Sequence, residues 1–174
     1  MNIGVILNRV FRINNNPLFE YINQQKDAFD KCYLIIPKET FEEKGTDKKA
    51  NYYYGTLEKF LHKLKEHHIE PYVIDYSELG MFCTEHDIKE IVMAGDIMSY
   101  HQERYDIRHL KQAFKNHDIP VITINVNHYF KPSNTMNQQG QPYKVFTSFY
   151  KAHRSKLRQH SSYQYHLSDI ANKC

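Results

Sequence analysis

Short apolar runs alternate with longer amphipathic stretches along most of this chain. Five of these runs predict β-strands, and they span residues 2–7, 31–36, 71–75, 89–94 and 119–126. The second run is almost entirely apolar, as expected of a strand that is covered on both faces. Strands that alternate with helices form parallel sheets. The pattern therefore predicts an α/β fold with a five-stranded parallel sheet and helices on both faces.

The stretches between the strands carry helix signals. Asn16 followed by Pro17 is typical of a helix start, and we predict a helix from there to about Phe29. Residues 50–68 form the clearest predicted helix because their apolar residues recur at intervals of three and four positions. These apolar residues are Leu57, Phe60, Leu61 and Leu64. The remaining helical stretches are 77–86, 102–116 and, as a last helix or an extended anchor, 143–157.

In a sheet of this kind, ligands bind at the carboxyl ends of the strands, near the point where the strand order reverses. The segments at that edge are 7–16, 37–46, 75–80, 95–104 and 126–133. Arg9 and Arg12 come directly after the first strand. They can contact an anion or a chromophore, or they can satisfy loop carbonyls and carboxylates. Any small-molecule site should be built from these segments.

Composition limits the classes of protein that fit. A length of 174 residues suits one domain with a short tail, and 14% aromatic residues predict that most of it folds. No apolar run reaches the roughly 18 residues of a membrane span. Three widely spaced cysteines without a C-x-x-C pair fit a reducing cytoplasm rather than a disulfide framework. The net charge of +3 is only mildly basic and does not by itself predict nucleic-acid binding.

The motifs of common catalytic and nucleotide-binding sites are missing from the sequence. The six glycines are too far apart for G-x-G-x-x-G or for a P-loop. Neither a G-x-S-x-G elbow nor H-E-x-x-H occurs. Cys83 and His86 have half of the spacing of a metal site, but no second pair matches it, which favours a buried thiol beside a surface histidine. We therefore predict no catalytic residue and no metal site.

Two stretches distinguish the chain from a generic α/β domain. One is the arginine-containing segment 8–18, and the other is 143–151, where aromatic residues alternate with lysines in YKVFTSFYK. Apolar periodicity alone favours a core-facing last helix for the second stretch. The alternative is an exposed aromatic patch around Phe146, Phe149 and Tyr150 that docks another protein or domain.

Taken in order, these stretches resemble the N-terminal domain of the DNA photolyase/cryptochrome family (deoxyribodipyrimidine photolyase-like). The family segment W-F-R-x-D-L-R-x-x-D-N-x-x-L corresponds to residues 8–18, although its Trp-Phe pair and its aspartates are missing here. The family segment Y-x-V-F-T-P-F corresponds to residues 143–149, with serine in place of proline. A third segment, 100–104, resembles the family's segment in which Asn-Glu contacts the antenna pteridine; Glu103 matches and Gln102 stands at the asparagine position.

The resemblance covers about residues 1–158 and implies a Rossmann-like antenna domain of the HUP type, with 159–174 as a polar start of the interdomain connection. In the family this domain holds a light-harvesting chromophore, which is a reduced folate, FMN or a deazaflavin. FAD and damaged DNA bind to a C-terminal helical domain that this chain lacks. The resemblance thus implies the light-harvesting part of a flavoprotein lyase that repairs cyclobutane pyrimidine dimers in DNA, located in the cytoplasm and not catalytic alone.

The resemblance also assigns residues to roles. The expected cofactor-binding residues are Arg9, Arg12, Gln102 and Glu103, with Glu103 accepting hydrogen bonds from a ring and Arg12 facing a ring carbonyl or a phosphate. Loop 38–49 would close over the chromophore, but it lacks the histidine of folate-type members. The expected interdomain residues are Tyr143, Lys144, Phe146, Thr147 and Phe149.

Two other functions fit the residues. One is a nucleotide-binding α/β protein of the universal-stress or electron-transfer-flavoprotein type, which would need a glycine-rich phosphate loop that is not seen here. The other is a non-catalytic interaction module that docks through YKVFTSFYK.

Overall fold

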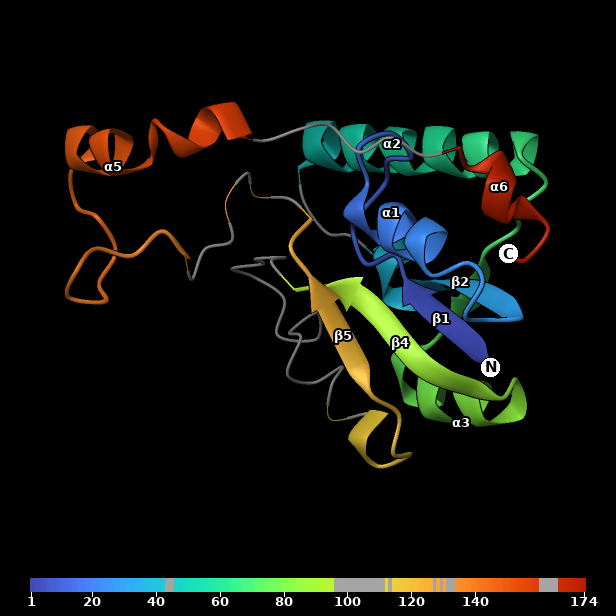
Figure 1. The fold of residues 1–174 in the computed structure, drawn as a ribbon. Coiled ribbons are helices and arrows are strands. Elements are labelled where there is room, and N and C mark those ends of the chain that lie inside the picture. Colours follow the sequence, from blue (N-terminus) through green and yellow to red (C-terminus); the bar gives the residue numbers. More distant parts are fainter. Residues whose placement is uncertain are drawn as a thin grey trace.

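The computed structural model describes residues 1–42, 46–95, 112, 114–126, 128, 130, 134–159 and 166–174. Its centre is a sheet of five parallel strands in the order β3-β2-β1-β4-β5 (Figure 1). The strands are β1 (Asn2–Ile6), β2 (Lys31–Pro37), β3 (Tyr72–Ile74), β4 (Ile88–Ala94) and β5 (Val121–Ile124). This arrangement confirms the predicted α/β fold class.

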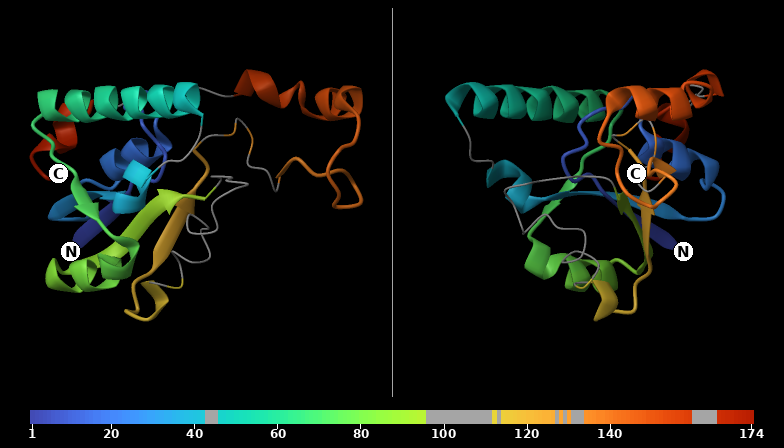
Figure 2. Two further views of the ribbon diagram at one scale, coloured as in Figure 1. Left: turned by 180° about the vertical axis from the view of Figure 1, so that it is seen from behind. Right: turned by 90° about the vertical axis from the view of Figure 1, so that its left-hand side faces the viewer.

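Helices cover both faces of the sheet. The helices α1 (Pro17–Gln24) and α2 (Asp47–Glu66) lie on one face, and α3 (Leu79–Glu85) lies on the other (Figures 1 and 2). Successive side chains of a strand point to opposite faces, so Val5 packs into the cluster on the α1 side and Ile6 into the cluster on the α3 side. The strand order reverses between the neighbours β1 and β4, which places the ligand edge expected of such a sheet at their carboxyl ends.

The ends of the helices differ from the predicted ones in places. Asn16 caps α1 through its side-chain oxygen and Pro17 occupies the first turn, as predicted, but α1 ends at Gln24 rather than near Phe29. The long helix α2 begins at Asp47, where the Thr46 hydroxyl accepts a hydrogen bond from a backbone N–H of the first turn.

Residues 38–49 were expected to be a surface loop, and this expectation is wrong for their first part. Residues Lys38–Glu42 form the short 3-10 helix η1, in which Glu39 and Thr40 are buried. Two tyrosines of α2 hold this turn against the body: the Tyr53 hydroxyl donates to the Thr40 carbonyl at 2.9 Å and the Tyr54 hydroxyl to the Phe41 carbonyl at 2.8 Å. The pattern of polar residues does not reveal these long-range bonds.

The chain beyond β5 forms one helix that stands away from the sheet and one that packs beside α1. Helix α5 (Phe146–His153) stands away from the sheet, whereas α6 (Ser168–Ala171) lies beside α1 (Figures 1 and 2). Ile170 is fully buried, and the Cys32 N–H donates to the carbonyl of Lys173 at 2.7 Å. Part of the segment that was expected to be a polar linker therefore packs into the core.

Two further observations complete the fold. Most of the helix predicted at 102–116 lies outside the described residues, but Phe114 near its end is fully buried on the α3 side. Among the helices of the described part of the chain, none is long and apolar enough to cross a membrane.

Candidate functional site

Asn8 lies two residues beyond the end of β1, at the point where the strand order reverses. The Leu7 N–H still donates to the Ile35 carbonyl at 2.8 Å, so the backbone belongs to the sheet up to that residue. The Asn8 side chain is completely buried, and neither its amide nitrogen nor its amide oxygen has a hydrogen-bond partner among the described residues. A buried polar group without a partner costs about 1–3 kcal/mol. Such a group at a ligand edge is typical of a site that a further molecule or segment completes.

The backbone turns sharply after Asn8. Arg9 has a φ of 57°, in the left-handed region that side chains other than glycine rarely adopt. Its guanidinium lies over the ring of Tyr53, with the central carbon 5.3 Å from the ring centroid. Strained backbone of this kind is concentrated at binding and active sites. The contact with a chromophore expected of Arg9 stays a prediction.

Arg12 joins the loop after β1 to the end of β5. Its Nε donates to the Asn15 carbonyl at 3.2 Å, and its terminal nitrogen donates to the carbonyl of Val126. The side-chain amide of Asn16 in turn donates to the Arg12 carbonyl at 2.7 Å. Arg12 therefore satisfies loop carbonyls, which is one of its two expected roles, and its contact with a ring or a phosphate stays a prediction.

Polar side chains also follow β2 and β3 at the same edge. Thr40 is fully buried, and its hydroxyl has no hydrogen-bond partner within the described ranges. The Glu39 carboxylate accepts a hydrogen bond from the Tyr76 backbone N–H at 3.2 Å, which joins the ends of the two strands. This edge thus contains buried polar side chains after two adjacent strands, β1 and β2, and a hydrogen bond that ties the end of β3 to them.

Strands β4 and β5 form the other half of the carboxyl edge. The Gly95 N–H donates to the Ile124 carbonyl at 2.8 Å, and a Cβ added at Gly95 would lie only 2.8 Å from the Cβ of Thr123. Asn125 donates to the His128 carbonyl, while its side-chain oxygen is buried without a partner in the part of the chain described. Gln102 and Glu103 lie outside the described residues, so their expected role in binding stays a prediction.

Groups suited to acid–base or metal chemistry do not gather at this edge. In the described ranges no three His, Cys, Asp or Glu side chains come together as a metal site. Cys83 is fully buried in α3, and burial raises the pKa of its thiol to about 12. The neighbouring His86 ring stacks on Phe82 at 4.1 Å and bonds to the Phe82 carbonyl. These contacts give both residues a packing role.

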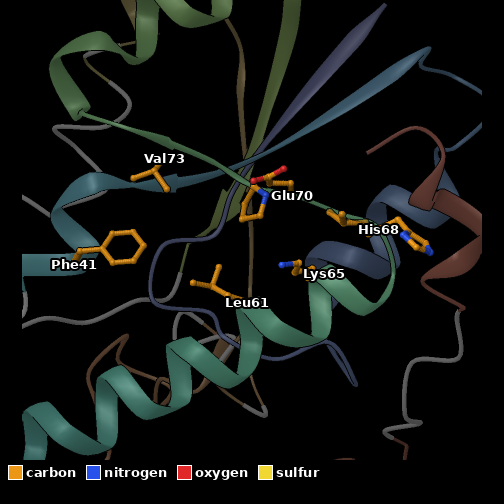
Figure 3. Close-up of a pocket in the computed structure, with 8 residues that line it drawn as sticks. Phe41, Leu61, Lys65, His68, Glu70 and Val73 are labelled. Atoms are coloured by element: carbon orange, nitrogen blue, oxygen red, sulfur yellow. The ribbon is translucent and has the colours of Figure 1, made fainter.

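Two of the cavities lie beside α2, outside the β1–β4 junction. The larger, of about 580 Å³, runs between α2 and the edge strand β3, with Phe41 and Val73 facing Leu61 and Lys65 across it (Figure 3). A smaller one of about 240 Å³ is lined by Arg12 together with Lys59 of α2. Of the expected cofactor-binding residues, Arg12 lines the smaller of these two cavities.

The sequence model of the DNA photolyase family matches residues 5–166. The chain belongs to the DNA photolyase family. This confirms the resemblance on which the residue roles were based. A search of the curated proteins finds no match.

A solved structure supports the same fold. The chain is similar to a bacterial class III photolyase from Agrobacterium tumefaciens, with a TM-score of 0.60 and 14% sequence identity. The match covers 92% of this chain but only 32% of that chain. This photolyase-family chain therefore spans about a third of the length of the class III photolyase that it resembles.

The three aromatic residues among the expected interdomain residues divide into two groups. Tyr143 and Phe149 contact each other edge to face, with ring centroids 5.8 Å apart, and both contact His153. Phe146 instead stacks on Tyr150 and is 75% exposed. The expected exposed aromatic patch thus consists of Phe146 and Tyr150, with Phe149 only partly exposed.

Sequence reasoning missed Asn8 and Thr40. Both follow an apolar strand within three residues at the carboxyl edge, so their positions were available from the sequence. Their burial was not, because it depends on how the loops after the strands fold back over the sheet. A polar residue directly after an apolar strand of a parallel sheet is the signal that could have found them.

Proposed function

We propose that this chain is the light-harvesting domain of a DNA photolyase and binds a heteroaromatic antenna at the carboxyl edge between β1 and β4. The observation that carries the proposal is the buried amide of Asn8, which has no partner among the described residues at the point where the strand order reverses. Family membership supports it.

The chemistry of Asn8 fits the proposed ligand. Its amide offers N–H donors and a carbonyl acceptor side by side. Flavins, deazaflavins and pterins each present a ring N–H next to a ring carbonyl, which is the complementary edge. A bound antenna would supply absorption of blue light and transfer of the energy. The residues of this chain would bind the ring and orient it, and Thr40 and Asn125 offer further buried oxygen atoms for that purpose.

The repair reaction is assigned to another domain. We propose that light-driven cleavage of cyclobutane pyrimidine dimers belongs to an FAD-binding helical domain, which would also hold the damaged DNA. Positioning of the cofactor and the substrate is the protein's contribution to such chemistry. The aromatic residues of 143–149 are proposed to contact that domain. The unpaired cysteines fit a cytoplasmic location.

The test is a titration of the purified chain with methenyl-folate, FMN and a deazaflavin, followed by visible absorption and by fluorescence quenching. Wild type should bind at least one of the three with a shifted spectrum. Asn8→Leu should lose this binding, whereas Asn116→Leu, an exposed position before β5, should keep it.

Two results would contradict the proposal. Wild type that binds none of the three chromophores would not be an antenna domain. Wild type that binds ATP and none of the chromophores would instead support a nucleotide-binding protein, because an asparagine amide also matches the edge of adenine.

A further inference from the structure

Two of the three cysteines lie close together at the amino edge of the sheet. Cys32 is the second residue of β2, and its backbone N–H donates to the carbonyl of Lys173 at 2.7 Å. Cys174 follows Lys173 directly, so the covalent bonds on either side of this hydrogen bond place the Cα atoms of the two cysteines at most about 7 Å apart. That separation is within the reach of a disulfide.

The two side chains also face each other. Both pack into the same apolar cluster on the α1 side of the sheet, and they hydrogen-bond to each other. The third cysteine, Cys83, is fully buried in the cluster on the opposite face of the sheet. Only one pairing of the three thiols is therefore compatible with the fold.

The turn that carries Cys174 is held in place by several hydrogen bonds. The backbone N–H groups of Lys173 and Cys174 both donate to the Ile170 carbonyl, at 3.0 and 3.1 Å. The Lys173 Nζ donates to the Phe29 carbonyl at 3.0 Å and also to the carbonyl of Lys26. Ile170 itself is fully buried. These contacts keep Cys174 beside the start of β2.

The two thiols differ in their access to solvent. Cys32 is buried, whereas Cys174 is partly exposed. Burial, and after it the hydrogen bond to the Cys174 side chain, raise the pKa of the Cys32 thiol well above its usual value. The thiolate is the reactive form of cysteine, so a dissolved oxidant would react first with the more accessible Cys174.

We propose that Cys32 and Cys174 form a reversible disulfide when the chain meets a hydroperoxide. The Cys174 thiolate first attacks one peroxide oxygen, so that an S–O bond forms, the O–O bond breaks and the departing hydroxide takes up a proton as water. The Cys32 sulfur then attacks the Cys174 sulfur, so that the S–S bond forms, the S–O bond breaks and the hydroxide leaves with the Cys32 proton as a second water. Two thiols thus lose two electrons and two protons, and one hydrogen peroxide becomes two water molecules.

The cross-link would fasten α6 to β2 and close a loop of almost the whole chain. Cross-links that close long loops restrict the unfolded chain most, so the oxidised form should resist unfolding better than the reduced form. Transient disulfides that respond to oxidants are the kind expected in a reducing compartment, and both thiols are free in this structure. The pair lies at the amino edge, so its oxidation does not depend on a chromophore at the carboxyl edge.

The test treats the full 174-residue chain with an equimolar amount of hydrogen peroxide, blocks the remaining thiols and digests the product with trypsin. Cleavage after Lys31, Lys38 and Lys173 releases peptide 32–38 and Cys174 as a single residue. Mass spectrometry should find peptide 32–38 heavier by one disulfide-linked cysteine, in a chain that stays monomeric on a non-reducing gel. Before digestion, the oxidised chain should melt at least about 5 °C higher than the reduced chain, and dithiothreitol should reverse the shift.

Matched variants separate this pair from general thiol oxidation. Cys83→Ala should form the same cross-link with the same thermal shift, because Cys83 lies on the other face of the sheet. Cys174→Ser changes a partly exposed position and should fold, but it should show neither the heavier peptide nor the shift. Wild type oxidised in urea should give mixed pairs that include Cys83, because the fold no longer selects the partners.

Three outcomes would overturn the proposal. The first is peptide 32–38 without an added cysteine after treatment of the folded wild type. The second is a cross-link between two chains through Cys174 instead of one within the chain. The third is the same yield of the Cys32–Cys174 pair in urea as in the folded chain, or a cross-link without a thermal shift.

Discussion

Replacing Asn8 by leucine should make the chain more stable while it abolishes the proposed binding of a chromophore. The Asn8 amide is completely buried and has no partner among the described residues. Removing a buried polar group that lacks a partner, with little change in side-chain volume, recovers about 1–3 kcal/mol. For a chain of this size, each kcal/mol raises the midpoint of thermal unfolding by about 2–4 °C.

Urea denaturation followed by circular dichroism measures this effect. With a slope of about 2 kcal/mol per molar urea, the Asn8→Leu midpoint should rise by about 0.5–1.5 M while the slope stays unchanged. Asn8→Asp is the opposite perturbation, because it buries a charge at the same place, and it should lower the midpoint.

The outcome for Asn8→Leu separates two explanations of the buried amide. A lower midpoint for the leucine variant would refute the reasoning, because it would mean that the amide is already hydrogen-bonded in the isolated chain. Gain of stability with loss of binding is the pattern of a site that sacrifices stability for function.

Three further predictions concern other parts of the domain. Gly95→Ala should destabilise the chain by about 1–3 kcal/mol in thermal unfolding, since its Cβ would lie 2.8 Å from the branched Cβ of Thr123. Gly55→Ala in α2, where a Cβ meets nothing within 4 Å, should instead stabilise it by about 0.5–1 kcal/mol. The Ser77 hydroxyl and backbone N–H lower the pKa of Asp75, so this group stabilises the fold above about pH 4 and loses the effect as pH falls through its lowered pKa. NMR titration should show that pKa rise in Ser77→Ala, and an unchanged value would contradict the assignment.

The sheet was predictable because β1, β2 and β4 are mostly apolar runs of five to seven residues. Lys31–Pro37 is an example, since its consecutive apolar residues have no alternative to burial on both faces. The start of α1 was equally clear from the cap at Asn16. Both signals come from residues that are neighbours in the sequence, so they can be found without knowledge of distant contacts. The strands β3 and β5, with three and four residues, are shorter than the predicted 71–75 and 119–126.

Features that depend on distant contacts could not be predicted in the same way. Ile170 lies in a polar stretch, and only its packing beside α1 makes it a core residue. The role of Arg12 was left open between loop carbonyls and a ligand, and its bond to the carbonyl of Val126, 114 residues away, reveals the first role. Asn8 carries no charge, and its complete burial becomes visible only in the fold.

Because α6 packs beside α1, the first and last residues of the chain lie close together. The Asp30 N–H donates to the Met1 carbonyl at 2.8 Å, and two residues further on the Cys32 N–H donates to the Lys173 carbonyl at 2.7 Å. Both ends therefore lie at the amino edge of the sheet, as the N and C labels of Figure 1 indicate. The carboxyl edge, where Asn8 lies, is on the opposite side. A short peptide that joins residues 1 and 174 would leave the carboxyl edge untouched. New termini could be opened next to α5, because His153 is the one buried residue of this helix. The domain is thus suited to circular permutation, and a fluorophore attached at either end would report on folding without entering the proposed binding site.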